Sequence, residues 1–231
     1  SYTVAVAYQA VCEAARRMDI DLSNATVAIV GATGAIGSVS AELLARHTAQ
    51  LILIGRRLDQ LARVKARVQA VGAEVQVSTE VAAIRHADVI LAVSAAGEAI
   101  IQAYHLKPGA VVCDVARPRD VSKKVVEERD DVLVIEGGMV EVPGNVDFHF
   151  DFGLPFKMAF ACMAETMALA MEERYESYTL GKDLTVSQVE AIDDIARRHG
   201  FKLGGFRSFE RAVTDEQIES IKRRAFGRVV V

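Results

Sequence analysis

The feature that most constrains the fold is an apolar run that leads through a glycine-rich turn into a helix-like segment. The run is Thr26 to Val30, the turn is Gly31-Ala32-Thr33-Gly34-Ala35-Ile36-Gly37, and the helical segment is Ser38 to Ala45. Glycines let the backbone approach a pyrophosphate closely, and the amide groups that open the helix point at the anion. The G-x-x-G-x-x-G spacing is a variant of the dinucleotide-binding motif. The alternative is that the glycines serve only a tight turn and close packing.

Around this turn, short apolar runs alternate with helix-like segments. Apolar positions recur every four residues from Val6 to Met18, which predicts a helix over 2–18. The predicted strands are 26–30, 51–54, 74–78, 88–93, 110–114 and 132–135, and the predicted helices are 35–47, 58–71, 80–86, 98–103 and 121–129. Such alternation produces βαβ units, so we predict an α/β fold with a doubly wound parallel sheet of the Rossmann type.

The pattern changes after Gly137-Gly138. Residues 141–155 contain glycines, prolines and phenylalanines, which predicts a loop with buried aromatic side chains. Helices are predicted over 156–176, 185–199 and 214–225. The predicted organisation is an N-terminal helix and joint over 1–24, a Rossmann NADP-binding domain over 25–150, and a helical extension over 151–231 that carries Cys162.

Composition excludes several classes of partner. The chain has 231 residues, of which 51% are hydrophobic, so a substantial core can form. A net charge of -4 gives no electrostatic reason to expect nucleic acid as a partner. No apolar run reaches the roughly 20 residues of a membrane span. Three scattered cysteines fit a reducing cytoplasm and lack the spacing of a metal site.

We expect a dinucleotide cofactor at the carboxyl ends of the strands, where open α/β sheets bind ligands. The predicted cofactor-binding residues are Gly31, Thr33, Gly34, Ala35, Ile36, Gly37, Arg56, Arg57, Ser94 and Gly138. Ser94 follows the fourth strand and Gly138 follows the sixth, so both loops reach the nicotinamide half. Arg117 and Lys123, near the fifth strand, are either ligand contacts or ordinary surface charges.

The end of the second strand favours NADP(H). NAD-preferring sites carry an acidic residue there, which binds the ribose 2′-hydroxyl. This sequence has Gly55 and two arginines instead, and guanidinium groups suit a 2′-phosphate. The alternatives are that Arg56 and Arg57 are merely solvated, or that Asp59 binds a ribose.

Cys162 is the candidate nucleophile, since it lies early in an apolar helix, where a thiol can be activated. The alternative is inert packing, which is the usual role of a free cysteine. Cys12 and Cys113 are expected to be packing residues. His149 and His199 are acid–base candidates with a structural role as the alternative, and Glu141 and Asp151 are polar groups in or beside the aromatic loop.

Four sequence segments, in this order, resemble one family of reductases. They are 21–38, with the glycine turn; Gly137-Gly138-Met139-Val140-Glu141; Phe160-Ala161-Cys162-Met163-Ala164-Glu165-Thr166-Met167; and Val189-Glu190-Ala191-Ile192 with Arg198-His199-Gly200-Phe201. Together they resemble the long-chain fatty acyl-[acyl-carrier-protein] reductase family, the aldehyde-forming enzymes of cyanobacterial alkane synthesis. The F-A-C-x-A-E and R-H-G-F segments are more specific than the glycine motif.

The resemblance implies a mechanism. Members of that family attack an acyl thioester with the cysteine of F-A-C-x-A-E, which is Cys162 here, and reduce the acyl-enzyme with NADPH to a fatty aldehyde. It implies an acyl carrier protein or acyl-coenzyme A as the acyl donor. Members also carry an N-terminal segment before the equivalent of Ser1, which is missing here, and residues 206–231 run past the usual family end.

Two other hypotheses stay open at this point. One is an NADP-dependent dehydrogenase of the shikimate, glutamyl-tRNA reductase or methylene-tetrahydropterin type, in which Cys162 is only packing. The other is a non-catalytic module that binds NADP(H). Acyl chain length and oligomeric state are open in all three.

Overall fold

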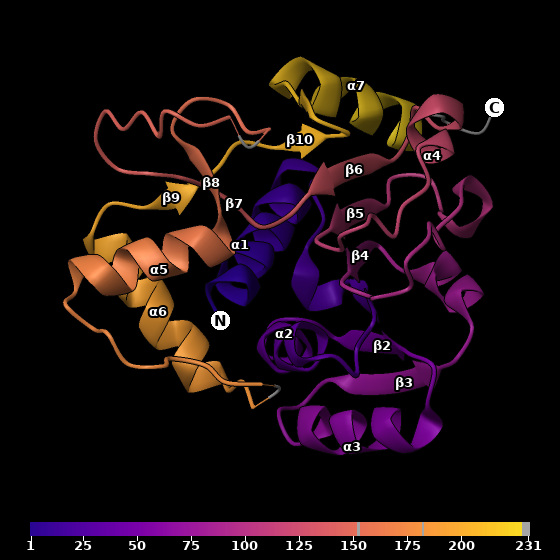
Figure 1. Ribbon diagram of the computed structural model, residues 1–231. Helices are drawn as coiled ribbons and strands as arrows, with labels where there is room; N and C mark the ends of the chain where they lie inside the picture. The colour runs from indigo at the N-terminus through magenta and orange to yellow at the C-terminus, as the bar shows by residue number, and fades with distance from the viewer. Residues whose placement is uncertain (152, 182, 228–231) are drawn as a thin grey trace.

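A six-stranded parallel sheet is the centre of the computed structural model, which describes residues 1–151, 153–181 and 183–227 (Figure 1). The strand order is β3-β2-β1-β4-β5-β6, which is a Rossmann topology. The strands are β1 (Thr26–Val30), β2 (Gln50–Ile54), β3 (Glu74–Ser78), β4 (Val89–Ala92), β5 (Val111–Asp114) and β6 (Leu133–Glu136). All six predicted strands are therefore confirmed, to within two residues at either end.

Alternate side chains of each strand enter two different cores. On one face, Val27 and Ile29 of β1 join a cluster with α1 (Tyr2–Arg17), α2 (Ala35–Ala45) and α3 (Leu58–Gln69). On the other face, Ala28 and Val30 join a cluster with η2 (Val81–His86) and α4 (Lys124–Glu128). Because both faces are covered, the inner strands β1, β4 and β5 are apolar except at their ends, whereas the edge strand β3 alternates polar and apolar residues.

The predicted helix over 98–103 is wrong. Ile101 instead forms an isolated parallel bridge with Val121, and only a short 3-10 turn, η3 (Ala103–His105), follows. The same bridge occupies Val121, so α4 begins at Lys124 rather than at 121. The predicted helix over 80–86 is the 3-10 helix η2.

The predicted helix over 156–176 is also shorter than expected. Its first residues form β8 (Met158–Phe160), which pairs antiparallel with β7 (Met139–Glu141), and α5 follows as Ala161–Met171. The helix ends because Glu173 adopts a positive φ of 56° and the Arg174 amide donates back to Leu169. β9 (Lys202–Leu203) completes this small sheet in the order β8-β7-β9.

The prediction of buried aromatic side chains in the loop over 141–155 is wrong for Phe150, which is 74% exposed, and Phe148 is only partly buried. Phe152 lies outside the described residues.

The C-terminal part of the chain is therefore mixed rather than purely helical. It contains α6 (Val186–Arg198), a two-stranded hairpin of β10 (Arg207–Ser208) and β11 (Arg211–Ala212), and α7 (Asp215–Phe226). The small sheet joins residues on both sides of position 150. The domain boundaries that we predicted over 1–24, 25–150 and 151–231 stay a prediction.

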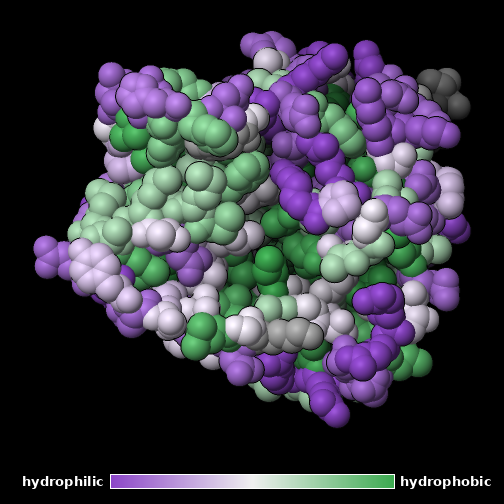
Figure 2. Space-filling model, in the orientation of Figure 1, coloured by the Kyte–Doolittle hydropathy of each residue, from purple (hydrophilic) through white to green (hydrophobic). Residues whose placement is uncertain are grey.

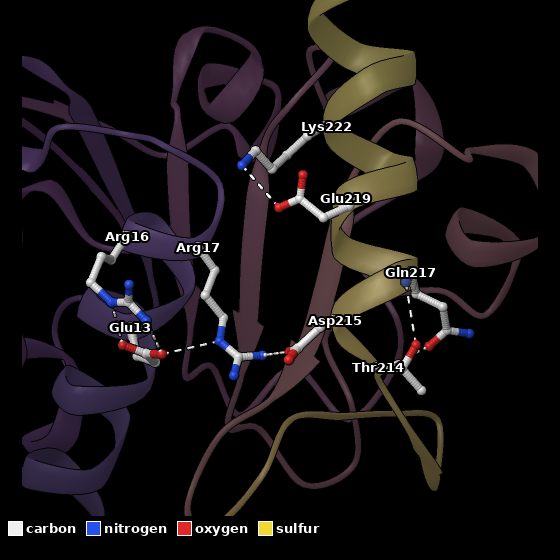
Figure 3. Close-up of polar contacts among 8 residues, drawn as sticks. All are labelled: Glu13, Arg16, Arg17, Thr214, Asp215, Gln217, Glu219 and Lys222. Atoms are coloured by element: carbon white, nitrogen blue, oxygen red, sulfur yellow. Dashed lines mark hydrogen bonds and ion pairs between the residues drawn. The ribbon is translucent and has the colours of Figure 1, made fainter.

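Charged side chains connect α1 with α7. Arg17 donates to Glu13 in its own helix and to Asp215 at the start of α7, at 3.0 and 2.7 Å (Figure 3). Thr214 caps α7 by accepting from the Gln217 amide. Beneath these contacts, Ile218 is 2% exposed and packs in the core that α1 shares with the sheet. The C-terminal helix is thus part of the Rossmann core.

Candidate active site

The glycine turn leads from β1 into α2, and two of its glycines are required by the protein itself. Gly31 has φ +88°, and a Cβ there would lie 2.7 Å from the Ser94 Cα. A Cβ on Gly37 would lie 2.3 Å from the Gly31 carbonyl oxygen. These contacts bring the turn against the end of β4 and close the first turn of α2 onto it.

The third glycine has no such packing reason. Gly34 is exposed, has φ -75°, and a Cβ there would meet only the Gly31 oxygen, at 3.4 Å. Gly34 is also the N-cap of α2, so the amides of Ala35, Ile36 and Gly37 belong to the first turn, where N–H groups lack partners within the helix. An open backbone beside free amides fits the approach of a pyrophosphate.

Arg56 and Arg57 lie just beyond the end of β2, and both are exposed. Within the described ranges, neither guanidinium has an ion-pair partner, although most arginines of this chain do. The side chain of Thr33 lies close by, because a Cβ on Gly55 would be 3.3 Å from the Thr33 Cγ2. The structure therefore brings Thr33 and the two arginines to one corner of the glycine turn. Asp59, in the first turn of α3, is exposed at the same corner.

Ser94 follows β4 and is held by the carboxylate of Asp120, which no sequence pattern identifies as a site residue. Asp120, 1% exposed, accepts from the Ser94 amide at 2.8 Å and from its hydroxyl at 2.5 Å. The Ser94 hydroxyl also accepts from the Ala96 amide. The Ser94 hydroxyl therefore both donates and accepts a hydrogen bond within the protein. These bonds hold the loop after β4 in place beside Gly31.

A second buried carboxylate organises the loop after β5. Asp114 accepts from the amides of Ala116 and Val121 at 3.0 and 2.9 Å. Burial raises the pKa of Asp114 to about 6, and the nearby charge of Asp120 adds to this effect. The position of Asp114 at a strand end is a sequence signal for a site residue. The sequence does not show which amides it accepts from, because that depends on how the following loop folds.

The ends of β5 and β6 meet the start of α5. A Cβ on Gly137 would lie 2.6 Å from the Val115 Cγ2, and the Ala161 amide donates to the Gly138 oxygen at 2.8 Å. A Cβ on Gly138 would lie 3.8 Å from the Thr3 Cγ2, so α1 also begins here. The glycine turn and the N-terminal ends of α1 and α5 therefore lie along the same carboxyl edge of the sheet, with the ends of β4 and β5 between them.

Cys162 is the second residue of α5, directly after the residue that binds Gly138. Its side chain is exposed, whereas Cys113 is buried and Cys12 is partly buried. Inert packing therefore does not describe Cys162. Neighbouring strands lie about 4.8 Å apart, and β6 is the third strand from β1 in the sheet. The ends of β1 and β6 are therefore about 14 Å apart, a distance that an extended ligand can bridge.

Helix α5 is anchored near both ends by carboxylates. Glu165 accepts from the Ser1 hydroxyl at 2.7 Å and from the Tyr2 amide at 2.8 Å, at the start of α1. Glu172 pairs with His199 at 2.7 Å and with Arg198 at 2.5 Å, at the end of α6. His199 is thus a structural partner, and the sequence could not show these pairings because the partners are far apart in the chain.

The remaining candidates lie in local contacts. His149 is exposed and lies 3.5 Å from Asp147, and Asp151 accepts from the Gly153 amide. Glu141 pairs with Lys157. Arg117 and Lys123 are exposed, with Glu136 and Glu127 as ion partners at 3.9 and 3.8 Å.

The surface is hollowed between the side that carries α5 and the side that carries β4 and β5, and apolar residues are visible in the floor of the hollow (Figure 2). Cavities of about 1000 and 860 Å³ lie elsewhere, between α1 and residues 203–216 and between α4 and α7. No group of three or more potential metal ligands occurs within 1–151, 153–181 and 183–227. In the same ranges, no helix is long and apolar enough to cross a membrane.

The chain is similar to two larger proteins along most of its length. It is 28% identical over 227 residues to the aminotransferase PigE of a Serratia species, covering 96% of this chain and 27% of that protein. It is 32% identical over 213 residues to the long-chain acyl-[acyl-carrier-protein] reductase of Synechococcus elongatus, covering 87% of this chain and 60% of that protein. The chain thus spans less than two thirds of either relative.

Solved structures with a similar fold include a reductase and a dehydrogenase. Glutamyl-tRNA reductase from Methanopyrus kandleri matches with a TM-score of 0.46 and 18% identity, covering 95% of this chain and 42% of that one. Shikimate 5-dehydrogenase from Listeria monocytogenes, in complex with shikimate and NAD, matches with a TM-score of 0.44 and 15% identity, covering 57% and 52%.

The protein-family comparison is more direct. The shikimate/quinate 5-dehydrogenase family matches residues 13–136, more than half of the chain. The match begins inside α1, includes the glycine turn and both arginines, and stops at the last residue of β6. The matched residues include Ser94 but not Gly138 or Cys162, and the chain belongs to the shikimate/quinate 5-dehydrogenase family.

Proposed function

We propose that this chain is an NADP(H)-dependent oxidoreductase that reduces a fatty acyl thioester to a fatty aldehyde through an acyl-enzyme on Cys162. The observation that carries the proposal is the exposed thiol of Cys162 at the start of α5, one residue after the Ala161 amide that binds Gly138. This thiol lies at the same edge of the sheet as the glycine turn. The F-A-C-x-A-E resemblance and the 32% identity to a long-chain acyl-[acyl-carrier-protein] reductase support the substrate class.

The protein's own part in the reaction is nucleophilic. The Cys162 thiolate forms a bond to the thioester carbonyl carbon, and the carbon–sulfur bond to the carrier breaks, so that the carrier leaves as a thiolate and takes up a proton. NADPH, when bound, supplies the hydride that reduces the acyl carbon. Cleavage of the bond to Cys162 then releases the aldehyde and restores the thiolate. Splitting the reaction at a cysteine replaces one difficult step by two easier ones.

The residues present fit an NADP(H) cofactor. The open backbone at Gly34 and the first-turn amides of α2 suit the pyrophosphate. Arg56 and Arg57 would bind the 2′-phosphate that distinguishes NADP(H) from NAD(H). Gly138 and the loop at Ser94 would lie beside the nicotinamide. The acyl donor would be an acyl carrier protein or coenzyme A thioester, and an exposed thiol favours a reducing compartment such as the cytoplasm.

Intact-mass measurement tests the proposal. The complete protein is incubated with palmitoyl-coenzyme A without nicotinamide cofactor, beside a Cys162→Ser variant. We expect an added palmitoyl group on the unmodified protein only, and its loss as palmitaldehyde when NADPH is added. An unmodified protein that takes up no acyl group from either palmitoyl-coenzyme A or palmitoyl-acyl carrier protein would overturn the proposal.

A second candidate is a dehydrogenase that reduces a carbonyl directly, without a covalent step. The family match favours it, because residues 13–136 contain the nucleotide-binding half but stop before Cys162. In that case Cys162→Ala would leave hydride transfer unchanged. A loss of turnover with NADPH binding retained would favour the thioester reductase.

A further inference from the structure

The two segments most specific to the resemblance contain polar residues that the proposed chemistry does not use. In F-A-C-x-A-E the carboxylate is Glu165, and in R-H-G-F the polar side chains are Arg198 and His199. The structure shows that all three hold α5, the helix that carries Cys162. Glu165 binds the start of α1, and the Arg198 and His199 side chains bind Glu172 at the end of α5.

Glu165 is closer to the thiol than the other anchor is. It lies three residues after Cys162, so the two side chains are neighbours on the helix surface. Glu172 lies ten residues after Cys162, which is about 15 Å along a helix. The two anchors therefore differ in their distance from the thiol, although both are carboxylates that fix the same helix.

Glu165 uses both of its oxygens on one partner element. One oxygen accepts from the Ser1 hydroxyl, and the other accepts from the Tyr2 amide. The Tyr2 amide opens α1, whose N–H groups have no partner within the helix, and a carboxylate is favourable at this end of a helix dipole. Thr3, the next residue, lies against Gly138, whose oxygen receives the Ala161 amide. A closed loop of contacts thus runs from Glu165 through α1 and Gly138 back to the residue before Cys162.

We propose that Glu165 is a positioning residue for Cys162. By fixing the first turn of α5 to the start of α1, it sets the rotation of the helix and turns the thiol outward at the end of β6. Its carboxylate is engaged by the donors of α1 rather than opposing the charge of the thiolate. The proposal rests on the proposed function only in taking Cys162 as the reacting group.

The test compares Glu165→Ala with Glu172→Ala in the complete protein. Both variants remove one α5 anchor, so both should lower the melting temperature. We measure alkylation of Cys162 by iodoacetamide, located by peptide mass, and acyl transfer from palmitoyl-coenzyme A. Glu165→Ala should slow both reactions by about tenfold or more, because small misplacements of a reacting group have large effects. Glu172→Ala should leave both within about twofold of the unmodified protein.

Two further variants separate positioning from general damage. Glu165→Gln keeps an acceptor for the Tyr2 amide and should recover part of the lost rate, and Ser1→Ala, which removes one donor from the other side, should slow the reactions less than Glu165→Ala. The affinity for NADPH, measured by fluorescence, should not change in any of them. The proposal is overturned if Glu165→Ala reacts as fast as the unmodified protein, or if Glu172→Ala slows both reactions equally. Iodoacetamide needs no substrate, so an unmodified protein that is alkylated but never acylated would refute the proposed function while still deciding the role of Glu165.

Discussion

Glycine occurs at the three positions of the turn for two different physical reasons. A side chain at Gly31 or Gly37 would collide with backbone atoms of the protein, whereas a Cβ at Gly34 would meet only the Gly31 oxygen, at 3.4 Å. The motif therefore combines a folding requirement with a binding requirement. Single alanine substitutions can separate the two.

Gly34→Ala should weaken NADPH binding without loss of stability, since φ is -75° and the added methyl meets only one atom at contact distance. Gly37→Ala should instead lower the free energy of unfolding by about 2–4 kcal/mol, because the new Cβ overlaps the Gly31 carbonyl. Urea unfolding and NADPH titration of both variants check this. Equal stability losses at the two positions would contradict the distinction.

Arg56 and Arg57 provide the cofactor preference in the proposed site. Replacing both by alanine should weaken NADPH binding by about 10- to 100-fold, as expected for loss of charge-assisted contacts to a phosphate. Binding of NADH should change little, because it has no 2′-phosphate. Titration with each nucleotide, monitored by its fluorescence, gives the ratio of the two dissociation constants. If Asp59 binds a ribose hydroxyl instead, Asp59→Ala will weaken NADH binding and the arginine variant will not alter the ratio.

At the scale of elements, helix α5 is anchored by an ion-pair cluster at its C-terminal end. Hydrogen bonds from His199 and Arg198 hold the pKa of Glu172 below its usual value. A carboxyl with a lowered pKa in the folded state stabilises the protein above its unfolded pKa, and the contribution is lost as pH falls through the folded pKa. The charge of Arg198 also offsets the unfavourable position of a carboxylate at a helix C-terminus.

The unmodified protein should therefore lose more stability than Glu172→Gln when the pH falls from 7 to below about 4. The comparison is made by urea unfolding at each pH, because other titrating groups contribute equally to both proteins. Once Glu172 is protonated the two proteins should unfold alike. A difference that persists at the lowest pH would mean that the side chain acts through packing rather than charge.

Sequence patterns predict some elements better than others, for a physical reason. The strands are near-continuous apolar runs such as Val89 to Ala92, and burial on both faces requires that pattern. Residues 98–103 have helix-like composition, but Ile101 forms a parallel bridge with Val121 and the segment is therefore not helical. Residues 158–160 likewise pair with β7, a partner that no local pattern identifies.

The residues of the candidate site likewise differ in how well the sequence predicts them. The glycine turn is visible in the sequence because its residues are consecutive. Asp114, Asp120 and Glu165 are not, because each acts through amides or hydroxyls from a different segment. The assignment of Cys162 as nucleophile stays a prediction, although its exposure is a property that only the structure reveals.

At the scale of the whole molecule, α7 is a core element. Ile218 is 2% exposed among residues of α1 and the sheet, so Ile218→Ala should lower the free energy of unfolding by about 2–4 kcal/mol. Asp215→Ala removes an exposed ion pair with Arg17 and should change the free energy of unfolding by less than about 1 kcal/mol. Urea unfolding of both variants measures the two contributions. Comparable effects would mean that α7 is held by charge rather than by apolar burial.

The two ends of the chain share one core. Tyr2, Val4 and Val6 of α1 pack with Ala164 of α5 and Ile192 of α6, in a cluster that residues 13–136 join only through α2. During synthesis the first half of α1 therefore emerges long before its partners, which follow at a separation of more than 150 residues. Its apolar face lacks its partners in α5 and α6 until those two helices leave the ribosome. Such high contact order slows folding, so residues 13–136 can fold before the core that α1 shares with α5 and α6 is complete.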